Sequence, residues 1–244
     1  MNVMSLTKIS EMKRQRKKRS DAGSFILTAR DLQMLEWIGE QFAIRFDHLQ
    51  MLAVHFKDMD VDEMPKALSF SAAHQLTSRW VKEGLVERKK IFAEDPMWVW
   101  LTKKGLETVG LDMKFHTPAI SKLKHNHAVN AVRLYAEKKL KDEIRWVSER
   151  EANALRKHQG KPHLVDGEIE FEDGLVVGIE VELTQKRKQR LRSILHHLKN
   201  EYETVWYFSS DEVFNVVQNA IEKIPSHEET FIQHRLYPIM NMGA

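Results

Sequence analysis

The sequence has 244 residues and contains no cysteine. This absence excludes disulfide bonds, thiolate zinc sites and cysteine nucleophiles, so any bound metal must be held by oxygen or imidazole ligands. The chain also lacks an apolar run close to the roughly 20 residues that a membrane-spanning helix needs. Residues 1–20 carry charge where a secretory signal would need its apolar core. We therefore expect a globular cytoplasmic protein without a membrane segment.

Positive charge is concentrated at the start of the chain. Residues 1–24 contain seven Lys or Arg and two Asp or Glu, a net charge of +5, whereas the whole chain has a net charge of +3. We interpret this segment as a disordered arm that binds a polyanion by counterion release. A solvated tail with no binding role is the alternative. The densest basic run consists of Lys13, Arg14, Arg16, Lys17, Lys18 and Arg19.

The N-terminal half predicts three helices followed by a β-hairpin. Apolar residues recur at helical spacing in three stretches, residues 28–42, 46–56 and 71–84. Thr28, with Asp31 three residues later, is a shortened capping box that predicts where the first helix begins. Residues 85–92 and 97–102 predict two strands around a turn.

This order of elements resembles the winged-helix fold over residues 25–112. In that fold the third helix enters the major groove of DNA and the hairpin forms a wing beside it. The outward side chains of the third helix are of types that bond base edges and phosphates, namely Gln75, Ser78, Arg79 and Lys82. The wing would carry Arg88, Lys89 and Lys90. The resemblance implies binding to double-stranded DNA, and a winged helix that serves only protein contacts is the alternative.

The pattern changes after a linker around Pro118. In residues 119–244 the predicted order is helix, strand, strand, strand, helix, strand, helix, which indicates an α/β sheet with a central hairpin. The fold class expected for the whole chain is a combination of α+β and α/β. The predicted helices are residues 121–143, 186–201 and 211–224, and the predicted strands are residues 144–150, two acidic runs between 163 and 184, and residues 204–210.

The register of the acidic hairpin follows from the requirement for one apolar face. A two-residue loop at Asp173 and Gly174 would mix charged and apolar side chains on each face. A three-residue loop, residues 172–174, with Gly174 in the left-handed conformation, puts the apolar residues together. The cross-strand pairs are then Phe171 with Leu175, Ile169 with Val177, Gly167 with Ile179, and Val165 with Val181.

In that register the opposite face gathers carboxylates. Asp166 lies opposite Glu180, with Glu182 two residues along and Glu168 close by. Like charges opposite one another destabilise a sheet, and a hard cation such as Mg²⁺ or Mn²⁺ would remove the repulsion. We expect Asp166, Glu180 and Glu182 to be the metal ligands. An ordinary solvent-facing polar side is the alternative, and the hairpin alone favours neither.

A basic helix start follows the hairpin. Five cations fall in the first turns of the predicted helix, where the macrodipole disfavours positive charge. They are Lys186, Arg187, Lys188, Arg190 and Arg192. A phosphate backbone passing over this end would make the arrangement favourable. Metal-binding carboxylates beside such a helix start indicate phosphodiester chemistry, in which a metal activates water and polarises a phosphoryl oxygen.

The motif "VDG" followed by "EVE", in this order of elements, is similar to the restriction-endonuclease-like PD-(D/E)xK core. Asp166 matches the aspartate of that motif and Glu180 matches its second acid. The motif has lysine where this chain has Glu182. We expect Lys186 to supply the missing charge.

Across nearly the whole chain, a winged helix followed by "HNHAVNAV", "WVSER", "VDG" and "IEVELT" resembles the replication-relaxation group and the MobC-type relaxases of mobilizable plasmids. This resemblance implies a protein that recognises a transfer origin and nicks one strand there, assisted by an accessory mobilization protein. The motif residues carried over by position are His127, Asn130, Glu149, Asp166, Glu180 and Glu182.

The tripeptide "HNH" at residues 125–127 suggests two other nuclease motifs. The histidine–hydrophobic–histidine motif needs a strand and an apolar middle residue, and the HNH nuclease motif spreads its residues over a ββα unit. The segment fits neither, and His127 is explained equally well as a structural histidine. No tyrosine has sequence neighbours that favour covalent cleavage, and the sequence leaves both cleavage by water and cleavage through a tyrosine open.

A non-catalytic protein is the competing class. It would be a winged-helix regulator of plasmid replication or transfer, with a degenerate nuclease fold. The missing lysine at position 182 favours it, whereas the ordered carboxylate face and the basic helix start favour a nuclease.

Overall fold

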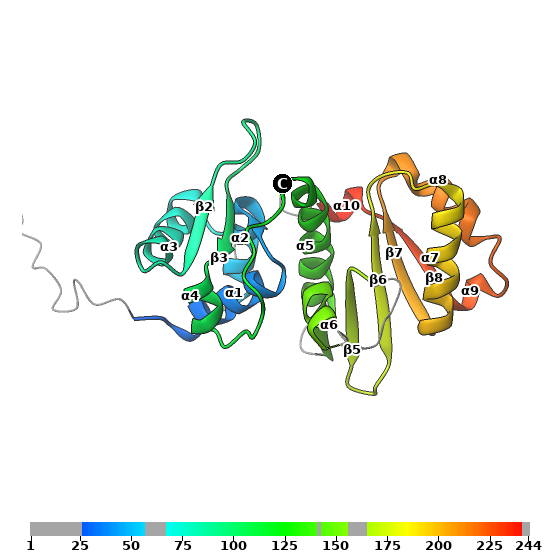
Figure 1. Cartoon of the computed structure of the whole chain (residues 1–244), viewed down its shortest axis with the longest axis horizontal. Coiled ribbons are helices and arrows are strands. Elements are labelled where there is room, and N and C mark those ends of the chain that lie inside the picture. The colour runs from blue at the N-terminus through cyan, green and yellow to red at the C-terminus, as the bar shows by residue number, and fades with distance from the viewer. Residues whose placement is uncertain (1–25, 57–66, 141–142, 156–164, 241–244) are drawn as a thin grey trace, which may run out of the picture.

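The computed structural model describes residues 26–56, 67–140, 143–155 and 165–240. These residues form a mixed α+β protein with ten helices and two sheets. Figure 1 shows the smaller sheet and its helices on one side of the long helix α5 (Ile120–Leu140) and the larger sheet on the other. No helix in the described ranges is both long and apolar enough to cross a membrane.

The N-terminal half contains the three predicted helices and the two predicted strands, with two short elements added. Its elements are α1 (Ala29–Glu40), β1 (Ile44–Arg45), α2 (Phe46–His55), α3 (Phe70–Lys82), β2 (Val86–Lys89), β3 (Trp98–Leu101) and α4 (Lys103–Thr108). The strands form an antiparallel sheet in the order β1-β3-β2. The sequence pattern did not predict β1 and α4 because both are too short to show periodicity.

One carboxylate both begins α1 and holds α3 against it. The hydroxyl oxygen of Thr28 accepts a hydrogen bond from the backbone N–H of Asp31 at 3.2 Å, and the Asp31 carboxylate accepts the backbone N–H of Thr28 at 3.0 Å. The predicted capping box is therefore confirmed. Asp31 is buried and also accepts a hydrogen bond from Nε1 of Trp80 at 3.0 Å.

The C-terminal half contains one five-stranded sheet in the order β4-β5-β6-β7-β8. Strands β4, β5 and β6 are antiparallel neighbours, whereas β6, β7 and β8 are parallel. The elements after α5 are β4 (Ile144–Ser148), α6 (Glu149–Leu155), β5 (Gly167–Phe171), β6 (Val176–Glu182), α7 (Lys188–Glu201), β7 (Thr204–Ser209), α8 (Asp211–Ile221), α9 (His227–Thr230), β8 (Phe231–Arg235) and α10 (Tyr237–Met240). The predicted elements are present, and the sequence pattern missed α6, α9, β8 and α10.

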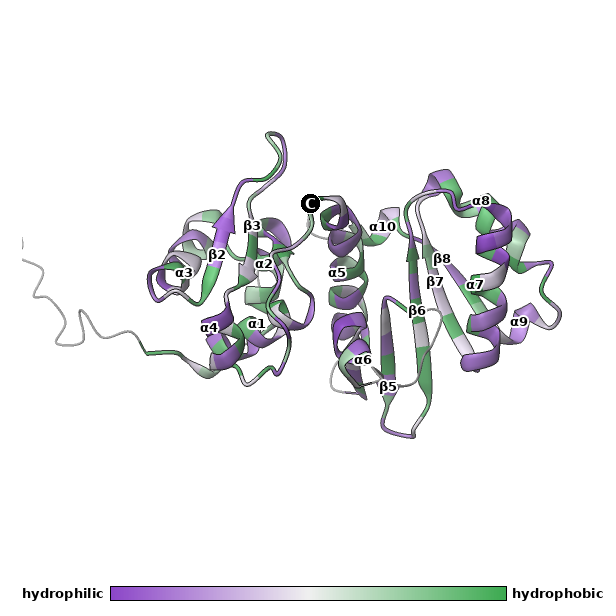
Figure 2. Cartoon of the chain, viewed as in Figure 1, coloured by the Kyte–Doolittle hydropathy of each residue, from purple (hydrophilic) through white to green (hydrophobic). Residues whose placement is uncertain are grey.

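The larger sheet separates two apolar layers. Ala128 and Val132 of α5 pack with Ile179 on one face. On the other face Leu195 of α7 and Val217 of α8 pack with the strand residues of β7. Figure 2 shows hydrophobic residues along most of β6 and hydrophilic residues along much of α7. Because helices cover both faces, polar side chains on this sheet must find partners inside the protein.

The register of the hairpin is confirmed within β5 and β6. Gly167 pairs with Ile179, and Ile169 pairs with Val177. The backbone N–H of Phe171 donates to the carbonyl oxygen of Leu175 at 2.9 Å, which closes a three-residue loop. Gly174 in that loop has φ of 89°, a left-handed conformation that L side chains rarely adopt.

The predicted pairing of Val165 with Val181 is wrong. The β5–β6 ladder begins at Gly167, and Val165 packs in the layer under α7 and α8 while Val181 packs under α5. The chain turns at Asp166, whose carboxylate accepts a hydrogen bond from the backbone N–H of Val181 at 2.7 Å. The side chain of Asp166 therefore takes the place that a further pair of strand residues would occupy.

Helix α5 contributes to both halves of the protein. Its residue Leu134 belongs to the apolar core of the N-terminal half, and Leu123 packs with Trp98 of β3. The side-chain amide of Asn130 donates to the backbone carbonyl oxygen of Ala43 at 2.8 Å. Around Pro118, where a linker was expected, residues 111–119 have no helix or strand. The helix that follows it is nevertheless packed against the N-terminal half.

Candidate functional site

Three carboxylates of the hairpin strands are buried. Glu168, Glu180 and Glu182 are only 1%, 2% and 4% exposed. Glu180 pairs with Tyr207 and Glu182 with Ser209 in the parallel register of β6 and β7, so both lie on the face covered by α7 and α8. The alternative of a solvent-facing polar side is therefore wrong. Buried carboxylates of this kind need a counter-charge or hydrogen-bond donors.

Lys186 supplies such a counter-charge. Its ammonium group ion-pairs with Glu182, and its Nζ lies 3.8 Å from Oε1 of Glu180. Lys186 lies in the short segment between the end of β6 and the start of α7. Its side chain therefore reaches back to the last residues of β6. The side chain is about one-fifth exposed, at 21%, whereas its two partners are buried. The structure thus brings together three of the expected site residues.

Asp166 is held by two donors. Its Oδ1 lies 2.7 Å from Nε2 of His125, and its Oδ2 accepts the backbone N–H of Val181 at 2.7 Å. Burial acts to lower the pKa of His125, but the hydrogen bond to Asp166 and the negative charges of Asp166, Glu180 and Glu149 outweigh it and raise the pKa. The imidazole therefore faces several carboxylates at once.

His125 was not among the residues expected in the site. The tripeptide "HNH" drew attention to His125, yet the motifs it suggested did not fit. Helical spacing alone does not reveal which side of α5 faces the hairpin. The contact with Asp166, which is 41 positions away in the sequence, is a long-range contact.

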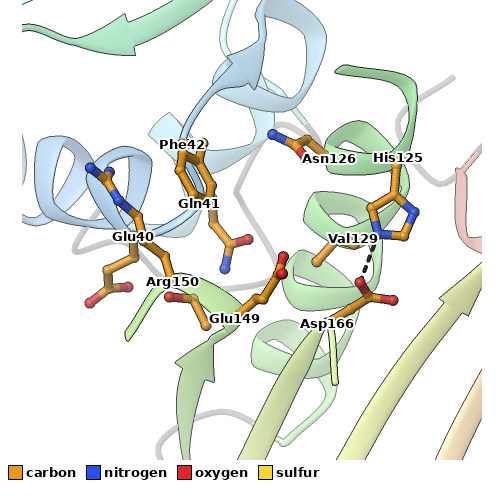
Figure 3. Close-up of a pocket in the computed structure, with 10 residues that line it drawn as sticks. Glu40, Gln41, Phe42, His125, Asn126, Val129, Glu149, Arg150 and Asp166 are labelled. Carbon is orange, nitrogen blue, oxygen red and sulfur yellow. Dashed lines mark hydrogen bonds and ion pairs between the residues drawn. The ribbon is translucent and has the colours of Figure 1, made fainter. Parts of the chain in front are cut away.

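A pocket lies between the two halves beside this group. It is lined by Glu40, Gln41 and Phe42 from the end of α1, by His125, Asn126 and Val129 from α5, by Ser148, Glu149 and Arg150 from the β4–α6 junction, and by Asp166. Figure 3 shows the His125 ring directed at Asp166, with Glu149 on the same side of α5 as Val129. The expected site residue Glu149 therefore lines the same pocket as Asp166.

One wall of the pocket has an unusual backbone. Phe42 has φ of 64°, a left-handed conformation that is rare for a bulky residue. The guanidinium of Arg150 lies over its ring, 4.7 Å from the centroid, and donates to the backbone carbonyl oxygens of Gly39 and Lys114. Such conformations persist where the surroundings hold them, and they cluster at functional sites.

Tyr207 faces the carboxylates from the next strand. The side chain is fully buried, and its hydroxyl has no hydrogen-bond partner in the structure. Burial raises the pKa of Tyr207, and the charges of Glu180, Glu182 and Asp166 raise it further. A tyrosine nucleophile must be accessible and must lose its proton easily. The phenol of Tyr207 has neither property in this position.

Two expected site residues lie elsewhere. The ring of His127 stacks on the ring of His48 from α2, and Asn130 bonds Ala43. Both therefore contact the N-terminal half, and the structure does not bring them to the carboxylates. Their place on α5 explains the difference, because side chains at His125 and His127 point to different sides of a helix.

The third helix presents most of the residues expected to contact DNA. Gln75, Arg79 and Lys82 are exposed on α3, and Lys89 and Lys90 are exposed at the end of β2. Arg88 behaves differently, because its guanidinium turns back onto α3. It donates to Oγ1 of Thr77 at 2.6 Å and to Oγ of Ser78 at 3.2 Å. Arg88 and Ser78 thus bond one another.

The remaining basic residues are divided between described and undescribed parts of the chain. Arg187, Lys188 and Arg190 are exposed at the start of α7. The expected arm, with Lys13, Arg14, Arg16, Lys17, Lys18 and Arg19, lies outside the described residues.

The oxygen donors suit a hard cation held by few protein ligands. Within the described ranges, the one group of three metal-capable side chains with ligand atoms within 4.8 Å of one another is Asp47, His48 and His127. The hairpin carboxylates do not form such a group. Mg²⁺ is often bound by one or two carboxylates together with substrate phosphates. Asp166 and Glu180 carry oxygen donors of the type that such a site uses.

Comparison with known proteins gives no relative: no protein-family model, no curated protein and no solved structure matches the chain.

Proposed function

We propose that the protein is a metal-dependent DNA endonuclease that nicks one strand at a plasmid transfer origin, with an accessory mobilization protein as partner. Its N-terminal half would be a winged helix that binds double-stranded DNA. Its C-terminal half would be a restriction-endonuclease-like nuclease core. The order of elements in each half supports this assignment, because the three helices precede a hairpin and the five-stranded sheet contains the acidic hairpin.

The observation that carries the proposal is the contact of Lys186 with Glu182 and Glu180. The PD-(D/E)xK motif joins two acids and a lysine at a hairpin of this kind. Here the expected lysine position holds Glu182, and the ammonium group arrives from four residues later. Two acids and a lysine therefore lie together here as well, although one acid is Glu182 instead of Asp166 and the lysine comes from a different position.

Asp166 and Glu180 would hold Mg²⁺ or Mn²⁺, which when bound activates water and polarises a phosphoryl oxygen. The residues of the chain then have separate roles. His125 orients Asp166 through its hydrogen bond. Lys186, the most exposed member of its group, would stabilise negative charge on the phosphate.

Water is the favoured attacking group in this proposal. Two tyrosines lie at the hairpin carboxylates in the described part of the chain. The hydroxyl of Tyr202 donates to Glu168, and the hydroxyl of Tyr207, which lies beside Glu180, is buried beneath α7 and α8. Strand cleavage through a phosphotyrosine intermediate would need one of these two hydroxyls to leave its place and reach DNA.

DNA would be held by two groups of side chains. The exposed Gln75, Arg79 and Lys82 of α3 would contact bases and nearby phosphates. The exposed cations at the start of α7 would contact the backbone near the scissile phosphate, where an anion also offsets their unfavourable position in the helix dipole.

A nicking assay tests the proposal. Supercoiled plasmids bearing candidate transfer origins are incubated with the protein, with Mg²⁺, Mn²⁺ or EDTA. We expect metal-dependent conversion to the open-circular form. Asp166→Asn and Lys186→Ala should each lower the rate by roughly a hundredfold or more, since metal binding and charge stabilisation are each worth several kcal/mol. Glu172→Gln, a carboxylate exchange in the exposed loop of the same hairpin, is the matched control.

A non-catalytic DNA-binding regulator is the second candidate. One observation favours it: both oxygens of Asp166 are already bonded, and Glu182 is already neutralised by Lys186. The hairpin could therefore be stable without a metal. Specific DNA binding with no nicking under any metal, unchanged in Asp166→Asn, would assign this role and reject the nuclease.

A further inference from the structure

Two histidines meet where α5 contacts the N-terminal half. The rings of His48 on α2 and His127 on α5 stack with centroids 3.9 Å apart and planes inclined by 25°. The edge of the Trp98 ring faces His127, with centroids 6.2 Å apart. Both imidazoles are almost fully buried, at 3% and 4% exposure.

The ring nitrogens of this pair lack partners. Nδ1 of His48 and both Nδ1 and Nε2 of His127 are buried and make no hydrogen bond. Buried imidazole nitrogens are normally hydrogen-bonded or bound to a metal. These two histidines are in contact and together have three ring nitrogens without a partner. A bound ligand would satisfy such nitrogens.

A third donor lies beside the rings. The carboxylate of Asp47 and one nitrogen of each histidine lie within 4.8 Å of one another. Asp47 is bonded by Arg45, with distances of 2.9 Å to Oδ1 and 2.6 Å to Oδ2. A carboxylate oxygen can accept two partners, so Asp47 can bind a metal while Arg45 orients it.

We propose that Asp47, His48 and His127 form a second metal site, selective for Zn²⁺ and chemically similar transition-metal ions. Two imidazoles and one carboxylate suit Zn²⁺, whereas Mg²⁺ and Mn²⁺ prefer oxygen donors. Ligand nitrogens bind Zn²⁺ at about 2.0–2.1 Å. An imidazole nitrogen binds a metal through a lone pair in the plane of its ring, so one or both stacked rings would have to rotate to direct a nitrogen at a shared ion.

The site joins the two halves of the protein. His48 belongs to the helix before α3, and His127 is two residues after His125, which bonds Asp166. An ion shared by α2 and α5 fixes the N-terminal half relative to the hairpin. This role is separate from the proposed nuclease metal, because it uses different residues and different donor chemistry.

Metal titration of the full chain after treatment with EDTA tests the site. We expect one equivalent of Zn²⁺ to bind by calorimetry and Co²⁺ to give visible ligand-field absorption. His127→Phe keeps an aromatic ring in the stack but removes both nitrogens, and Asp47→Asn changes a half-exposed side chain with little risk to folding. Each should weaken Zn²⁺ binding roughly tenfold or more.

Two control variants separate this site from other sources of binding. Asp166→Ala removes the proposed nuclease ligand and should leave Zn²⁺ affinity unchanged, while the exposed His116→Ala tests for surface histidine binding. Zn²⁺ should also raise the melting temperature of the wild type but not of His127→Phe. The proposal is overturned if the protein binds no Zn²⁺, or if His127→Phe and Asp47→Asn bind it as the wild type does. Loss of binding in Asp166→Ala alone would also overturn it.

Discussion

Nε2 of His125 lies 2.7 Å from Oδ1 of Asp166, and this contact ties α5 to the residue that begins the acidic hairpin. It is a part-buried ion pair when the imidazole is protonated. Burial acts to lower the pKa of His125, but Asp166, Glu180 and Glu149 together raise it, so folding favours the protonated imidazole relative to the unfolded chain.

The first prediction follows from this raised pKa. The contribution of His125 to stability should be complete below the unfolded pKa of about 6.5 and should be lost as the pH rises through the folded value. We expect His125→Gln to be less stable than the wild type by about 1 kcal/mol near pH 6, and by less near pH 9. Urea unfolding of both proteins across this range measures the difference. A gap that does not change with pH would contradict it.

The second prediction concerns the stacked histidines in protein without metal. Burial lowers the pKa of His48 to about 4 and that of His127 to about 3, with a smaller contribution from the positive charge of Arg45, although the carboxylate of Asp47 acts to raise both. The unfolded chain therefore binds more protons, so stability should fall as the pH drops below about 6.5 toward 4, by about 1–2 kcal/mol per histidine near pH 5. Unfolding in EDTA at several pH values tests this. His127→Phe should lose part of the acid sensitivity.

The third prediction concerns Arg133, which is buried on α5. It pairs with Glu40 at 2.7 Å and Glu137 at 2.6 Å and lies over the Trp37 ring, 4.6 Å from its centroid. Arg133→Ala would leave carboxylates without their counter-charge, so we expect a loss of about 3–5 kcal/mol. Lys138→Ala, an exposed change on the same helix, should stay within about 0.5 kcal/mol. Similar denaturation midpoints for the two variants would contradict this account.

The fourth prediction concerns Gly167, the first residue of β5. A Cβ atom there would stand 2.3 Å from Cζ2 of Trp146, whereas at Gly178 the nearest atoms, in the ring of Tyr202, are 3.1 Å away. Gly167→Ala should cost about 1–3 kcal/mol through overpacking. Gly178→Ala should cost less, because the neighbour must move only slightly. Equal melting temperatures for the two variants would show that Trp146 has room to move.

The fifth prediction concerns Arg79 on the exposed side of α3. Its guanidinium is half exposed and lies 3.6 Å from Oδ1 of Asp31, which would orient it. If it contacts a base, Arg79→Ala should cost roughly 1–3 kcal/mol on the specific site and much less on random DNA. Lys103→Ala, an exposed charge on α4, is the matched control. Gel-shift titrations at several salt concentrations measure both. An equal loss on both duplexes would assign Arg79 to phosphates instead.

Local rules predicted the hairpin because only one register satisfies them. With Gly174 in the left-handed position, Ile169 and Val177 must share a face, and the structure agrees. The same holds for Thr28 and Asp31, whose spacing alone determines the cap. Such features depend on neighbours in the sequence or on a strict two-residue period.

The candidate site was predictable only in part, because its contacts are long-range. The pattern predicted a carboxylate face with Lys186 near it, but it predicted neither that α7 and α8 bury that face nor that the Asp166 side chain bonds His125 of α5. The pattern did not show which of His125 and His127 faces the hairpin. A helical period shows which residues of α5 share a face, but it does not show what packs against that face. The short β8 was missed for a similar reason, because it is a strand only by pairing with β7.

Helix α5 also sets a limit on how this chain can be recombined. Residues 111–119 have no helix or strand, so they look like a natural place to cut the chain or to exchange its N-terminal half. A cut there would remove Leu134 from the N-terminal core and Leu123 from its contact with Trp98, so the Trp98 side chain would lose part of its cover. Chimeras that exchange the N-terminal half should therefore carry α5 with it and join beyond Leu140. A transplanted helix must then recover His125 opposite Asp166, so exchange is restricted to donors whose α5 matches both surfaces.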